Sequence, residues 1–134
     1  MSTLTQFLLD NPVDGITSEV IISERFAEHP FKITAMNGEQ FGDYQTRATT
    51  ATAKGKQKLK FNSKLFQQLV VLNHTVEPNF KDAEFIKKAG CTTPEQLLYK
   101  TLLAGEIVEL AEQISLLSGF NQDLDELADE VKNS

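Results

Sequence analysis

The chain has 134 residues, a formal net charge of −6 and a single cysteine, and these values narrow its possible functions. The length suits one domain with its own core, and the acidic balance argues against nucleic acid as the main partner. Cys91 has no second cysteine to pair with, which suits a reducing compartment. The N-terminus has no basic region of a signal peptide, and the longest aliphatic run, Leu69–Leu72, is too short to span a membrane. We therefore expect a cytoplasmic protein without membrane contact.

The N-terminal part of the chain predicts a short helix followed by a β-hairpin. Apolar residues have helical spacing over 3–9, and Pro12 ends that pattern. Apolar and polar residues then alternate over 19–26 and 31–36, with a short connection between them. This pattern predicts a hairpin over 19–36, which must pack on other elements to be stable.

The middle of the chain predicts two further helices around one ambiguous segment. Asn37 is placed to begin a short helix. Residues 46–61 are rich in Thr and Lys, and they predict either a second hairpin or a mobile loop. Asn62 is placed to cap a strong helix over 63–76, which Pro78 ends.

The C-terminal half predicts four helices. A short helix lies within 79–90 and is closed by a glycine. Two amphipathic helices, 93–104 and 106–118, are expected to meet near Gly105, and a last one covers 122–132.

Several residues fit the ends of these helices. Thr93 suits an N-cap, Pro94 the first helical position, and Gln96 the partner in a capping box. Gly119 suits a left-handed helix end, and Phe120 is placed to pack against it.

The expected fold class is α+β, with the N-terminal β-hairpin packed on a mainly α-helical domain that spans residues 1–134. The predicted core residues are Leu8, Val20, Ile22, Ile33, Phe66, Leu69, Val70, Leu98, Leu102, Ile107, Leu110, Ile114 and Phe120. Glu106, Glu109 and Glu112 lie off the apolar stripe of 106–118. Such stripes are more often core than binding surface. If the last two stripes instead bind a protein, the contact residues are Leu110, Ile114, Leu117, Leu124, Leu127 and Val131.

The charges are unevenly distributed along the chain. Five lysines crowd residues 54–64, whereas eight acids and only Lys132 follow Gly105. This polarity either orients a partner or a second copy of the chain, or it reflects two solvated surfaces.

Motifs for catalysis, cofactors or metals are missing from the sequence. There is no phosphate-binding glycine loop, and His29 and His74 stand outside any zinc-binding pattern. Asp123 and Asp125 lack the glycine and the distal glutamate of a calcium loop. Cys91 has no catalytic signature around it. We therefore expect a binding protein with no cofactor and no metal, rather than an enzyme.

Three motifs in fixed order resemble the XkdN-like phage tail assembly chaperone family. They are V-x-P-x-(F/L)-K-D-A-E at 76–84, L-L-A-G-E at 102–106 and G-F-(N/D)-x-D at 119–123. The resemblance covers nearly the whole chain, and residues 46–61 depart from it most.

The resemblance implies a protein of the host bacterial cytoplasm that binds the tape measure protein and keeps it soluble. It also implies help in bringing tail tube subunits onto that protein, absence from the finished tail, and often a longer frameshifted product. Self-association is an additional possibility from the charge pattern. The alternative is a structural tail completion or connector component, which stays in the particle.

Overall fold

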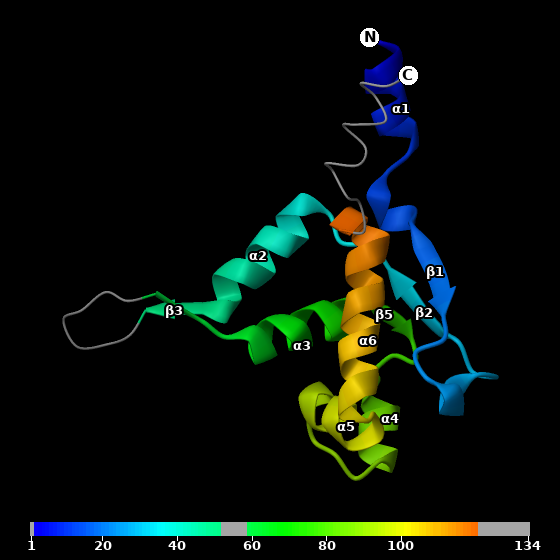
Figure 1. The fold of residues 1–134 in the computed structure, drawn as a ribbon, viewed down its shortest axis with the longest axis vertical. Helices are drawn as coiled ribbons and strands as arrows, with labels where there is room; N and C mark the ends of the chain where they lie inside the picture. The colour runs from blue at the N-terminus through cyan, green and yellow to red at the C-terminus, as the bar shows by residue number, and fades with distance from the viewer. Residues whose placement is uncertain (1, 52–58, 121–134) are drawn as a thin grey trace.

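The computed structural model describes residues 2–51 and 59–120, and it confirms the α+β fold class (Figure 1). Its helices are α1 (Thr3–Asp10), α2 (Gly38–Ala48), α3 (Ser63–His74), α4 (Ala83–Lys88), α5 (Pro94–Thr101) and α6 (Ala104–Ser115). Its strands are β1 (Thr17–Val20), β2 (Phe31–Thr34), β3 (Thr49–Ala51), β4 (Leu59–Phe61) and β5 (Thr75–Glu77). Short helical segments are η1 (Val13–Gly15), η2 (Glu24–Phe26) and η3 (Leu116–Phe120).

The main sheet is antiparallel, with strand order β1-β2-β5. The predicted pairing of the first two strands is confirmed, with Thr17 opposite Thr34 and Val20 opposite Phe31. The extent predicted for the first strand was wrong, because β1 stops at Val20. The chain then bends through η2, since Ser23 and Arg25 turn to bind a carboxylate on α6.

The third strand of the sheet was not predicted. α3 ends at His74 instead of residue 76, and Thr75–Glu77 forms β5 against the far side of β2. Lys32 lies opposite Glu77 in this pairing. Pairing with β2 ends the helix two residues earlier than predicted, and Val76 is exposed.

The predicted helix start at Thr93 is confirmed, with one difference in its hydrogen bonds. The Thr93 hydroxyl accepts a hydrogen bond from the Gln96 backbone N–H at 3.1 Å. The Gln96 side chain accepts from the Thr92 backbone N–H at 2.8 Å, one residue before the expected capping-box partner. α5 ends at Thr101, and Gly105 lies inside the first turn of α6, so the two helices meet before Gly105 rather than at it.

The core forms where α6 crosses α3 and the sheet (Figure 1). Most predicted core residues are buried there; these are Ile22, Ile33, Leu69, Val70, Leu98, Leu102, Ile107, Leu110 and Ile114. Val20 and Phe66 are only partly buried. Leu8 and Phe120 were wrongly placed in the core, since they are 63% and 57% exposed.

Two elements project from the body (Figure 1). α1 extends beyond the end of the sheet, and none of its residues is buried. β3 and β4 pair at the tip of α2, with Thr49 opposite Phe61, which agrees with the second-hairpin alternative for this segment. Residues 52–58 and the predicted helix 122–132 lie outside the described residues. Within the described ranges, no helix is long and apolar enough to cross a membrane.

Candidate functional site

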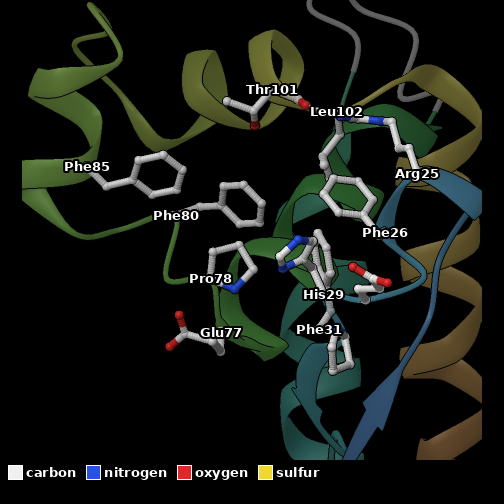
Figure 2. A pocket seen from close by; sticks show the side chains of 12 residues that line it. Arg25, Phe26, His29, Phe31, Glu77, Pro78, Phe80, Phe85, Thr101 and Leu102 are labelled. Atoms are coloured by element: carbon white, nitrogen blue, oxygen red, sulfur yellow. Dashed lines mark hydrogen bonds between the residues drawn. The ribbon is translucent and has the colours of Figure 1, made fainter.

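An open hollow of about 510 Å³ lies beside η2, where segments distant in sequence meet (Figure 2). One wall comes from η2 and the turn that leads into β2. The opposite wall comes from the chain after β5, from α4 and from the end of α5. Figure 2 shows Phe80 and Phe85 on one side of the hollow and Phe26, His29 and Phe31 on the other.

Four phenylalanine rings contribute to the lining of the hollow. Phe26 and Phe31 pack edge to face with ring centroids 4.9 Å apart. Phe80 and Phe85 stack with centroids 6.2 Å apart. Phe31 and Phe80 are buried in the core, whereas Phe26 and Phe85 are only partly buried. The inner rings therefore give the hollow a rigid floor, and the outer rings are left available to a ligand.

A buried carboxylate holds the η2 wall in place. Glu106, in the first turn of α6, is only 3% exposed. Its Oε1 accepts from Arg25 Nη2 at 2.5 Å, and its Oε2 accepts from Arg25 Nε at 2.7 Å and from the Ser23 hydroxyl at 2.5 Å. It also accepts from the Leu103 backbone N–H at 2.7 Å. These hydrogen bonds, the Arg25 pair foremost, lower the pKa of Glu106 to about 2.

The charges left at the mouth of the hollow are acidic. The Arg25 guanidinium is paired with Glu106 and lies 4.3 Å from the centre of the Phe26 ring. The carboxylates of Glu28 and Glu77 line the same hollow at exposed positions, and neither takes part in a described ion pair. An apolar side chain flanked by basic residues would therefore complement this surface.

Apolar side chains outnumber polar ones in the lining of the hollow. Among the polar ones, Arg25 is held by Glu106, whereas no described hydrogen bond engages the side chains of Glu28 and Glu77. Across residues 2–51 and 59–120, no cluster of three or more His, Cys, Asp or Glu side chains is arranged to hold a metal.

Of the residues predicted from the sequence to bind a protein, those that the structure describes do not line the aromatic hollow. Leu110 and Ile114 lie fully in the core. Leu117 is half-buried and lines a second hollow of about 450 Å³ with Val20 and Ile33. Leu124, Leu127 and Val131 lie outside the described residues. A binding role for this set stays a prediction.

The aromatic hollow was missed at the level of sequence. The sequence pattern predicts strands at Phe26 and Phe31, and it places Glu106 off the apolar stripe of its helix. A signal was nonetheless present, because two of the family-like motifs contribute to this region. Residues 76–84 supply Pro78 and Phe80 to the hollow, and residues 102–106 supply Leu102 and the Glu106 anchor.

Comparisons with known proteins give one consistent result. A family model described as phage XkdN-like tail assembly chaperone protein matches residues 4–132. The uncharacterised protein YqbN of Bacillus subtilis (strain 168) is 27% identical over 138 residues, which cover 97% of this chain and 93% of that protein. The phage-like element PBSX protein XkdN of the same strain is 23% identical over the same shares. The crystal structure of YqbN matches 90% of this chain and 99% of that one, with a TM-score of 0.69 and 22% identity.

Proposed function

Because this chain belongs to the phage XkdN-like tail assembly chaperone family, we propose that it binds the tape measure protein in the host bacterial cytoplasm and keeps it soluble. It then helps to bring tail tube subunits onto that protein. The activity is holding and release, so it needs no cofactor, no metal and no catalytic step.

The observation that carries this proposal is the aromatic hollow beside η2. A tape measure protein is long and helical, so before assembly it exposes apolar helix faces to water. A large side chain from such a face fits a hollow of about 510 Å³ with a rigid aromatic floor. Glu28 and Glu77 at the mouth attract basic residues beside that side chain.

Co-expression with the cognate tape measure protein tests this proposal. The wild-type chain is expected to raise the amount of soluble tape measure protein and to co-purify with it. Glu77→Lys reverses a charge at the mouth of the hollow and should weaken retention about tenfold, which corresponds to about 1.4 kcal/mol. Glu112→Lys makes the same charge change at an exposed position on α6, away from the hollow, and should retain the partner normally.

Each outcome of this experiment has a defined meaning. If Glu77→Lys and Glu112→Lys lose retention of the tape measure protein equally, net charge and not the hollow governs binding. If even the wild-type chain leaves the tape measure protein insoluble and unbound, the chaperone proposal fails. Circular dichroism of each variant checks that the fold is kept.

The C-terminal stripe remains a second proposed contact. Deleting residues 121–134 should weaken the holding activity more than it weakens the fold, because terminal elements are commonly the least stably docked. Equal binding by the truncated chain would remove Leu124, Leu127 and Val131 from the proposed contact set.

A further inference from the structure

α1 is an apolar helix without a described partner. Leu4, Phe7 and Leu8 share one face at helical spacing. Their side chains are between 59% and 67% exposed. The opposite face carries Gln6 and Asp10, with Leu9 next to Gln6.

A short helix with an exposed apolar face must pack against another element to be stable in water. α1 has 8 residues, whereas isolated helices shorter than about 12 residues are marginal in water. Its cap, in which the Ser2 hydroxyl accepts from the Thr5 N–H at 3.0 Å, satisfies only one of the four free N–H groups at the helix start. Burial of apolar surface is the dominant favourable term in folding, so most of the helix's stability depends on packing.

The end of the described chain lies close to the base of α1. The Met36 N–H donates to the Ser118 hydroxyl in η3 at 2.9 Å, and the Ala35 N–H donates to the Ile16 carbonyl at 3.1 Å. β1 and η3 also share the walls of one hollow, to which Ser18 and Gly119 both contribute. The chain therefore continues from Phe120 close to the segment between α1 and β1.

The continuation has the length and the pattern that α1 requires. Leu124, Leu127, Ala128 and Val131 recur at helical spacing. As a helix, residues 121–134 would be about 20 Å long, against about 12 Å for α1. Gly119, with φ +98°, turns the chain out of the α6 axis immediately before this stripe begins.

We propose that residues 121–134 of the same chain dock on the apolar face of α1 in the free protein. Leu124, Leu127 and Val131 then pack against Leu4, Phe7 and Leu8, and the acids of the segment stay in water. This pairing concerns the free chain and does not depend on which protein the chain binds.

Cysteine cross-linking tests the pairing in the full-length chain with Cys91→Ser. Leu8→Cys with Leu127→Cys places one thiol on each apolar face. Gln6→Cys with Leu127→Cys moves the first thiol to the opposite face of α1 and is the matched control. Because a disulfide requires Cα atoms within about 7 Å, the facing pair should close internally about ten times faster than the control.

The products distinguish the possible covers of α1. A monomeric cross-link selective for the facing pair supports the proposal. Cross-linked dimers that predominate at low protein concentration would mean that a second copy covers α1, and equal rates in both pairs would mean that no docking occurs. Either result overturns the proposal.

A second measurement covers the case in which the cysteines themselves disturb the contact. Hydrogen exchange of the α1 amides should accelerate about tenfold in Leu127→Asp, and it should stay unchanged in Glu126→Gln, a substitution outside the apolar spacing pattern. Unchanged exchange in Leu127→Asp would overturn the proposal.

Discussion

At the scale of single residues, Glu106 links segments that are far apart in sequence. Its carboxylate binds Ser23 and Arg25, which lie 83 and 81 residues before it in the chain. Arg25 in turn donates to the Thr101 carbonyl at 2.9 Å, so the end of α5 is held by the same cluster. The position of η2, and with it one wall of the aromatic hollow, therefore depends on one buried acid.

Glu106→Gln should lower the free energy of unfolding at neutral pH by about 1–3 kcal/mol, because it removes charge-assisted hydrogen bonds from a buried site. Urea unfolding followed by circular dichroism measures the change. Glu112→Gln, on the exposed face of the same helix, is the matched control and should have little effect. An equal loss in both variants would contradict a special role for Glu106.

The same substitution should change the acid dependence of stability. The folded state lowers the pKa of Glu106 from 4.5 to about 2, so the unfolded state takes up the proton first as the pH falls. The stabilisation is complete above about pH 4.5 and is lost as the pH falls toward 2. Between these values the wild-type chain should lose stability more steeply than Glu106→Gln.

At the scale of elements, α6 supplies the centre of the core. Ile107, Leu110 and Ile114 lie on the face toward α3 and the sheet, whereas Val108 points outward. This division matches the apolar stripe seen in the sequence.

Ile114→Ala should destabilise the fold by about 2–5 kcal/mol, because it removes buried groups and leaves a cavity. Val108→Ala is the matched control, since Val108 is 55% exposed. Thermal and urea unfolding measure both variants. If Ile114→Ala leaves stability unchanged and only weakens partner retention, the stripe is a binding surface in solution.

Local chemistry explains which elements were predictable from the sequence. Asn37, Asn62 and Thr93 each accept a hydrogen bond from a backbone N–H three residues on, so these helix starts are encoded within one turn. The predicted boundary between α5 and α6 was wrong by only a few residues. Apolar spacing indicates that a helix is present better than it indicates where the helix begins and ends.

Features that depend on distant partners could not be predicted in this way. β5 exists because β2 offers a free edge. The β-branched Thr75 and Val76 and the following Pro78 favour extended backbone, but they do not indicate which strand pairs with them. In the sequence, Glu106 has the spacing of an exposed acid. Its burial depends on the hydrogen bonds from Arg25, which is 81 residues away in the chain. Likewise, the apolar pattern of α1 predicts a helix but does not indicate what covers it, which is why Leu8 was wrongly assigned to the core.

At the scale of the whole molecule, α1 and the aromatic hollow belong to different ends of the body. α1 projects at one end of the long axis, and η2 and α4, whose residues line the hollow, lie toward the other (Figure 1). A long helical partner that displaces residues 121–134 from α1 and also enters the hollow would gain from the second contact without a higher local affinity at either. Such binding is also readily reversible, since each contact is small.

Purified phage particles are expected to lack this chain, because a chaperone releases its partner when the tail tube is complete. Quantitative mass spectrometry of particles and of the producing cells measures this, with the tail tube protein as the positive control. A constant ratio of the chain to the tail tube protein in particles would instead identify a structural tail completion or connector component.

The buried Glu106 also has a consequence for the order in which the chain becomes native during synthesis. β1 and β2 are synthesised early, but the sheet is complete only after β5 has also been made. The acceptor for Arg25 is synthesised later still, because Glu106 lies 81 residues further along the chain. Synthesis proceeds at about 5–20 residues per second, so Arg25 and Ser23 stay without this carboxylate for several seconds. A nascent chain that stops before residue 106 therefore cannot fix η2, and the aromatic hollow takes its final form only after most of the protein has been made.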